Sequence, residues 1–328
     1  MSSAAMRGAA LNRWLCLLVL VLFAGSLATG PVLWPWRLGN EVGWAIVWEL
    51  RVPRATLGLL IGGALGLSGA ALQGWLRNPL VEPGVIGVSA CASFAAVCAF
   101  YSGLAATFTL ALPLAGIAGA ALAVALLMAA VRAGTGTVTL LLMGVAINAV
   151  AAALISLVLG LSPNPFAYQE ISLWMAGSIA DRDLRYLLIA APFIIAGGIV
   201  VLGAGRWLDA LSLGEDVARS LGADTGRLGL RLTLGVGLMV GAATSVSGVI
   251  GFVGLVAPHL VRARVGNRPS ATMIPSMLLG AALVLVADII VRFVPTAYEL
   301  QLGVITALVG APFLVRIIHR ARSAWLAT

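Results

Sequence analysis

The chain has 328 residues, of which 61% are hydrophobic and only 10% are charged, and its mean hydropathy is +1.07. Soluble domains hold roughly 45–50% apolar and about 25% charged residues, so this composition excludes an ordinary soluble protein. All 20 basic residues are arginines, and the lack of lysine excludes a Walker A phosphate loop, which requires one. The formal net charge of +8 is typical of arginine-rich cytoplasmic loops, so we expect no nucleic-acid partner.

Ten apolar stretches follow one another along the chain, most of them near the roughly 20 residues that a spanning helix needs. None alternates as a barrel strand does, so we predict an all-α integral membrane protein with about ten transmembrane helices. No long linker divides it, and residues 1–328 are expected to form a single transmembrane domain. The stretches are 14–33, 56–76, 84–101, 107–131, 138–160, 184–205, 229–248, 249–261, 273–291 and 301–318.

The arginines indicate the orientation. If the N-terminus lies inside and ten spans alternate, 14 arginines fall in inside loops and six outside. This bias follows the positive-inside rule, and both termini are expected in the cytoplasm. In this topology Arg51 and Arg54 precede the second helix and Arg292 follows the ninth, all three on the outer side.

A polar insert, LSLGEDVARSLGADTGR, occupies residues 211–227 between the sixth and seventh predicted spans. Gly214 and Gly222 bracket a short helix, as helix punctuation predicts. Two interpretations stay open: a solvated loop with one helical turn, or a helix on which a cytoplasmic partner docks.

Asp288 is the only acid within a predicted span, where a charge is costly. It indicates either a proton relay, as in a secondary transporter, or an ion pair with Arg292 four residues on. We favour the ion pair. Gly58, Gly62 and Gly66 recur every four residues, which is typical of a helix-packing face.

No constellation of enzymatic residues stands out. Cys16, Cys91 and Cys98 form no CxxC pair, and His259 and His319 are isolated in the sequence. We therefore expect no metal site, no cofactor in this chain and no catalytic residue.

Six stretches together carry a family resemblance. RVPRATLGLLIGGALGLSGAALQGWLRNPLVEPGVIGVS (51–89) is followed by LLLMGVAIN (140–148), LWMAGSI (173–179), GFVGLVAPHLVR (251–262), ADIIVR (287–292) and ELQLGVITALVGAPFLV (299–315). In this order they resemble the FecCD-type permeases of ABC importers for iron chelates and cobalamin. The resemblance covers about residues 45–318.

The resemblance implies a bacterial inner-membrane permease that works as a dimer, most often of identical subunits. Its expected partners are two cytoplasmic ATPase subunits, which bind ATP and Mg, an external substrate-binding protein that is periplasmic or lipid-anchored, and membrane lipid. A ferric siderophore is the first expected cargo, with haem second and cobalamin third. A proton-coupled transporter that uses Asp288 is the alternative from another class, and a membrane anchor without transport ranks last.

The resemblance also assigns residues. GEDVARSLG resembles the segment that contacts the ATPase, within about 209–231. The residues concerned are Leu213, Gly214, Glu215, Ala218, Arg219, Leu221 and Gly222.

On the outer side, Arg51, Arg54 and Arg292 match arginines that meet the binding protein, although Arg51 and Arg54 could instead anchor a helix end among lipid headgroups. Thr137 and Val138 align with a Thr-Ser gate of the cobalamin permease, and Val138 departs from that pattern. Asn148 and Ser156 are expected to line the path.

Overall fold

The structure is a computed structural model that describes residues 3–30, 39–161, 165–294 and 299–325. Within these residues every regular element is helical, which confirms the all-α prediction. The elements are α1 (Ser3–Ala28), α2 (Asn40–Ala45), η2 (Ile46–Arg51), α3 (Val52–Trp75), η3 (Pro83–Ile86), α4 (Val88–Tyr101), α5 (Leu104–Thr107), α6 (Ala111–Arg132), α7 (Thr137–Gly160), α8 (Pro165–Met175), α9 (Leu184–Leu202), α10 (Gly205–Leu211), α11 (Glu215–Ser220), α12 (Thr225–Ser247), α13 (Val253–Val265), α14 (Pro269–Phe293) and α15 (Leu302–Trp325).

In the part of the chain that the structure describes, seven helical segments are long and apolar enough to cross a membrane. They are α1, the continuous stretch from α2 to α3, α6, α7, α9, α12 and α14. The remaining predicted stretches lie on shorter helices, namely α4, α13 and the apolar part of α15. The total of about ten spans therefore stays a prediction.

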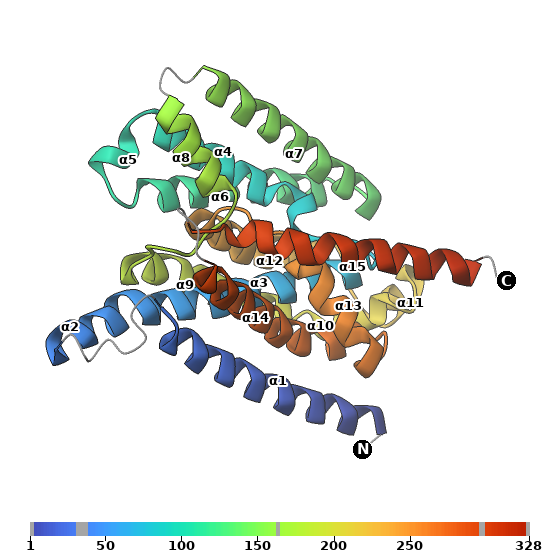
Figure 1. Ribbon diagram of the computed structural model, residues 1–328. Helices are drawn as coiled ribbons and strands as arrows, with labels where there is room; N and C mark the ends of the chain where they lie inside the picture. The colour runs from blue at the N-terminus through green and yellow to red at the C-terminus, as the bar shows by residue number, and fades with distance from the viewer. Residues whose placement is uncertain (1–2, 31–38, 162–164, 295–298, 326–328) are drawn as a thin grey trace.

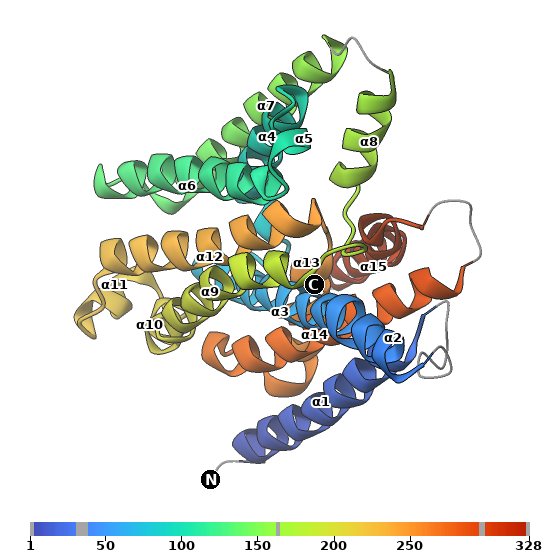
Figure 2. The ribbon, with the colours of Figure 1, turned by 90° about the vertical axis from the view of Figure 1, so that its left-hand side faces the viewer.

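The helices stack as a series of layers (Figure 2). α7 lies on one side, followed by α6 with α4, then α12 with α9, then α3 and α14, with α1 on the opposite side. In the most apolar 18-residue segment of each helix, 83% of the residues of the α2–α3 span are buried and 78% of those of α12. For α1 and α7 the values are only 17% and 22%. The two flanking helices thus present apolar surface that lipid or another protein must cover.

Close contact between α3 and α14 fixes the centre of the stack. A Cβ on Gly62 would overlap the carbonyl oxygen of Gly280, and a Cβ on Gly66 would overlap that of Ser276. The predicted packing role of these two glycines is confirmed. Gly58 is less tightly enclosed, since its Cβ would lie 3.3 Å from side-chain atoms of Ile179 and Leu285.

The two ends of the bundle differ in what they carry (Figure 1). The start of α1 and the end of α15 lie on the same side of the molecule as α11, which we call the α11 end. The opposite side carries α2 and α5 and is called the α2 end.

The helix boundaries correct the predicted place of three arginines. Arg51 and Arg54 do not precede the second spanning helix, because α2, η2 and α3 are continuous from Asn40 to Trp75. Pro53 lies in the first turn of α3, and the π-helical residues before it let the helix continue around the missing N–H. Arg292 does not follow α14 but lies in its last turn.

Candidate functional site

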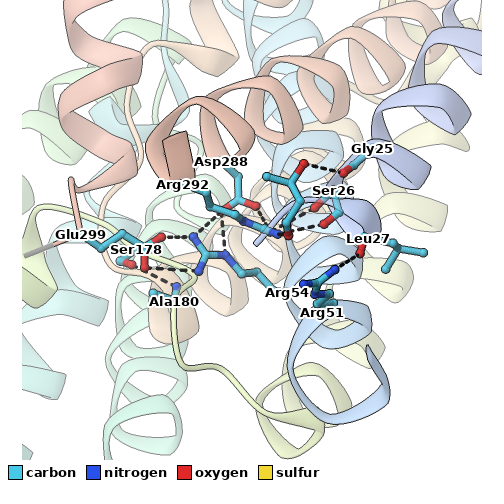
Figure 3. Close-up of polar contacts among 11 residues, drawn as sticks. Gly25, Ser26, Leu27, Arg51, Arg54, Ser178, Ala180, Asp288, Arg292 and Glu299 are labelled. Carbon is cyan, nitrogen blue, oxygen red and sulfur yellow. Dashed lines mark hydrogen bonds and ion pairs between the residues drawn. The ribbon is translucent and has the colours of Figure 1, made fainter. Parts of the chain in front are cut away.

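A buried carboxylate organises the α2 end. Asp288 on α14 is fully buried, and its two oxygens bind two different arginines (Figure 3). The Nε of Arg54 lies 2.8 Å from Oδ1, and Arg292, one turn further along α14, pairs with Oδ2. Pairing with both guanidinium groups offsets the cost of burying this charge.

Two of the arginines close the C-terminal end of α1, as Figure 3 shows. Arg51 Nη1 donates to the carbonyl oxygens of Leu27 and Ala28, at 2.8 and 3.2 Å. Arg292 Nη1 donates to those of Ser26 and Thr29, both at 2.9 Å. The last carbonyls of a helix have no partner within it, and cations near them also favour its dipole. Arg51 and Arg292 therefore tie α1 to α3 and α14.

Arg54 reaches further outward than these two. Its guanidinium also binds both carboxylate oxygens of Glu299, which lies three residues before the start of α15 at Leu302. The side chain of Glu299 is 35% exposed and that of Arg54 is 16% exposed, so this pair can be reached from solvent.

The exposed pair borders a cavity of about 480 Å³ at the α2 end. Arg182 lines the same cavity, donates from Nε to the carbonyl oxygen of Val246 at 2.9 Å, and lies over the ring of Tyr186. The ionisable residues around the cavity leave one positive charge in excess. They are Arg51, Arg54, Arg182 and Arg292 with Asp181, Asp288 and Glu299.

At the opposite end, α11 is a short helix between two glycines. Gly214 and Gly222 have φ values of 114° and 83°, a conformation that favours glycine and allows the sharp turns on either side. Ala218 is fully buried, and Arg219 pairs with Glu215 at 2.8 Å. The two bracketing glycines correctly predicted the extent of this helix. That it contacts an ATPase stays a prediction.

An exposed apolar stripe consists of one residue of the same helix and the two leucines that flank it. Leu213, Val217 and Leu221 are all exposed and recur every four residues. Val217 lies on α11, Leu213 precedes the turn at Gly214, and Leu221 directly follows the helix. Exposed apolar side chains therefore lie beside the ion pair of α11. Val217 was not singled out from the sequence, although it lies midway between Leu213 and Leu221, which are eight residues apart.

The predicted gate lies beside α11. Val138, in the first turn of α7, is 72% exposed and lines a cavity of about 400 Å³ together with Thr135, Glu215 and Arg219. Thr137 begins α7, but its side chain lies outside what the structure describes. The structure thus brings the loop before α7 and the α11 helix to one cavity, a proximity that the sequence did not indicate.

The two predicted path residues lie on the exposed side of α7. Asn148 and Ser156 are both exposed, and Ser156 Oγ donates to the carbonyl oxygen of Ala152 at 3.0 Å. Because α7 is mostly exposed in the single chain, these residues belong to a surface that a second protein could cover.

A comparison with protein families decides where the chain belongs. The model of the FecCD transport family matches residues 14–320. The chain belongs to the FecCD transport family. The matched range includes the cavity at the α2 end, α7 and α11.

Relatives in this family carry different cargoes. The ferric enterobactin transport system permease protein FepD of Escherichia coli is 37% identical over 84% of this chain and 82% of its own. The hemin transport system permease protein HmuU of Yersinia pestis is 35% identical, over 94% and 95%. The vitamin B12 import system permease protein BtuC of Vibrio cholerae is 37% identical, over 94% and 91%.

A solved structure agrees with the family assignment. A metal-chelate type ABC transporter in an inward-facing conformation superimposes with a TM-score of 0.85 at 29% identity. The match covers 95% of this chain and 99% of that one.

Within the family, the resemblance predicted Arg51, Arg54 and Arg292 as one docking group. The structure gives them different surroundings, since Arg51 and Arg292 bind α1 carbonyls and Arg54 binds Glu299. Arg182 and Glu299 border the same cavity and were not singled out from the sequence, because nothing in their local spacing indicates it.

Proposed function

We propose that this chain is the membrane-spanning subunit of an ABC importer for a ferric siderophore in the bacterial inner membrane. The observation that carries the proposal is the family match over residues 14–320, with relatives that are permeases of chelate and vitamin importers. The chain would act as one permease domain of about ten spans with both termini in the cytoplasm. It would supply a path for the cargo and no catalytic residue or cofactor.

The α11 end is proposed to face the cytoplasm and to contact the ATPase that binds ATP and Mg. Its support is the exposed apolar stripe of Leu213, Val217 and Leu221, which a soluble loop has no reason to display. The ion pair between Glu215 and Arg219 flanks the stripe and gives it a polar edge. An interface with an apolar centre and a polar rim is the usual arrangement.

The α2 end is proposed to receive the substrate-binding protein. Arg54 and Arg182 are the best-placed arginines for this contact, because both line the cavity and neither is fully buried. Arg51 and Arg292 also line the cavity, and they hold α1 in place beside it. Exposed ion pairs contribute only about 0–1 kcal/mol each, so these charges would orient the partner more than hold it.

A second copy of the chain is proposed to cover α7, so that the path runs between two subunits. The support is the exposed surface of α7, including Asn148 and Ser156. Thr137 and Val138, at the α11 end of the same helix, would narrow the exit.

The cargo is tested by a direct comparison. Assembled complexes of this chain, its ATPase and its binding protein are supplied with a ferric siderophore, haemin or cobalamin. We expect the siderophore to stimulate ATP hydrolysis most. Stimulation by haemin or cobalamin alone would overturn the cargo and leave the importer assignment intact.

The alternative of a proton-coupled transporter finds less support. Its carrier would be Asp288, which is fully buried and binds Arg54 and Arg292. Protonating this carboxylate would leave the buried guanidinium of Arg292 without its anion and leave Arg54 with Glu299 alone, which is costly. A carrier site must take up a proton in every cycle, and this arrangement opposes that uptake.

A further inference from the structure

The first turn of α14 lacks a cap from its own chain segment. Its N-cap residue is Arg268, whose side chain has no acceptor to offer, and no side-chain cap hydrogen bond is formed there. The N–H groups of a first helical turn have no partner within the helix and need one. Pro269 has no N–H, so the first donor that requires a partner is the N–H of Ser270.

Asp209, on α10, supplies the missing cap from 61 residues away in the sequence. Its Oδ1 accepts from Ser270 N at 2.8 Å, and its Oδ2 accepts from Ser270 Oγ at 2.6 Å and from Arg268 Nε at 2.7 Å. Burial acts to raise the pKa of Asp209, but the hydrogen bonds from Ser270 and Arg268 outweigh it and lower the pKa. The carboxylate is therefore charged where it meets the positive end of the α14 dipole.

This cap joins two parts of the molecule with different tasks. α10 leads directly into α11 through residues 212–214. At roughly 1.5 Å per residue, α14 extends about 37 Å to the opposite end, where Asp288 and Arg292 hold α3 and α1. Along the way, its backbone contacts that of α3 at Gly62 and Gly66. A displacement of α10 thus has a continuous packed route to the cavity at the α2 end.

We propose that Asp209 is a positioning residue of the transport cycle, which fastens α10 to α14 so that movement of α11 is passed to α14. The inference rests on the proposed function, because it requires α11 to be moved by an ATPase. Without the cap, α10 would still lie against α14 at Gly205, which leaves little room beside Ser270 and Met273, but it would lose the hydrogen bonds of Asp209. The ATPase would then move α11 with less effect on the spans.

The test measures cargo transported per ATP hydrolysed in proteoliposomes containing the full complex. This ratio does not depend on the amount of folded protein, so a purely structural loss leaves it unchanged. Losing a capping carboxylate shifts an equilibrium by roughly 2- to 30-fold, and in Asp209→Ala we expect the ratio to fall about threefold or more. In an Arg268→Ala, Ser270→Ala background the same substitution should have a smaller effect, because two of its three hydrogen bonds are already gone and only the one from the backbone N–H of residue 270 remains.

The matched control is Asp183→Ala. Asp183 also caps a helix, but it accepts from Arg185 N and Tyr186 N within the first turn of its own helix, α9. Its loss should leave the ratio as in wild type. If Asp209→Ala fails to assemble, Ser270→Ala removes one of the three hydrogen bonds and should lower the ratio in the same direction.

An unchanged ratio in whichever variant assembles would overturn the inference. A fall of equal size in Asp183→Ala would also overturn it, because capping in general would then explain the effect. A wild-type complex that does not couple uptake to ATP would contradict the proposed function instead, so the two failures are distinguishable.

Discussion

At the scale of single residues, Asp288 has the most demanding environment in the described part of the chain. It is fully buried, and both of its oxygens are bound by arginines that themselves hold other segments. Arg292 binds α1, and Arg54 binds Glu299. Through these two arginines, one carboxylate connects α1, α3, α14 and the segment that leads into α15.

Replacing Asp288 by asparagine should destabilise the protein strongly. Removing one partner of a buried ion pair costs roughly 3–5 kcal/mol, because the other charge is left uncompensated. Thermal unfolding of the detergent-solubilised chain should show this as a large fall in Tm. The control Asp183→Asn keeps a capping side chain and should unfold close to wild type. If Asp288→Asn folded normally and lost proton coupling instead, the secondary-transporter alternative would be favoured.

Glu299 competes with any carboxylate that a binding protein presents to Arg54. We predict that Glu299→Gln frees the guanidinium and raises the affinity for the binding protein. An exposed pair contributes about 0–1 kcal/mol, so the gain should be at most about fivefold. Glu49→Gln removes the same charge from an exposed position on η2 and serves as the control. A loss of affinity in Glu299→Gln, measured by surface plasmon resonance, would show that Glu299 holds Arg54 in place for docking.

Glu82 should make the stability of the folded protein depend on pH. Burial raises its pKa, and the hydrogen bond that it accepts from Phe252 N only partly offsets this. Ionised Glu82 is therefore less favourable in the folded state than in the unfolded state. The free energy of unfolding falls as pH rises from the unfolded pKa of about 4.3 to the raised folded value. Glutamine keeps an acceptor for Phe252 N without the charge.

Glu82→Gln should therefore have a higher Tm than wild type at about pH 7 and an equal Tm at about pH 4. Glu170→Gln, at an exposed position on α8, should show no such difference. A variant less stable than wild type at neutral pH would mean that the charge itself stabilises the N-terminus of α13.

At the scale of elements, α11 shows what a helix of six residues can do. Its buried face consists of Ala218, which lets it lie close to the bundle, while Leu213, Val217 and Leu221 point outward. Since these side chains are already exposed, changing them should cost little folding stability.

We predict that Val217→Asp abolishes co-purification of the ATPase while the chain still folds. A charge in the centre of an apolar interface is left without a partner when the interface closes. Ser220→Asp places the same charge on an exposed position of the same helix, outside the stripe, and should retain the ATPase. Full retention by Val217→Asp would place the docking surface elsewhere.

What the sequence could predict depends on how far apart the interacting residues lie. Spacing within one helix was enough to predict the pair of Asp288 and Arg292. The glycine-bracketed bounds of α11 also follow from local backbone preferences.

The tertiary contacts could not be found in this way. Arg51 binds a carbonyl 24 residues earlier, and Asp209 caps a helix 61 residues later. Glu82 binds the N–H of Phe252, 170 residues later. Such partners follow from how helices stack, which no local pattern specifies.

At the scale of the whole molecule, the polar features gather at the two ends of an apolar stack. The α2 end holds the arginine-lined cavity, and the α11 end holds the short helix and the residues beside the predicted gate. α3 and α14 join these ends through a backbone contact that leaves no room for side chains. This arrangement suits a subunit that receives cargo at one end and force at the other.

We propose that ATP hydrolysis in a partner drives import through this chain, and uptake into proteoliposomes measures this. The chain is reconstituted with its ATPase and binding protein, with a labelled ferric siderophore outside and ATP either present or absent inside. We predict uptake that requires both ATP and the binding protein. Uptake driven by a proton gradient without the ATPase would contradict it and make Asp288 the centre of the mechanism.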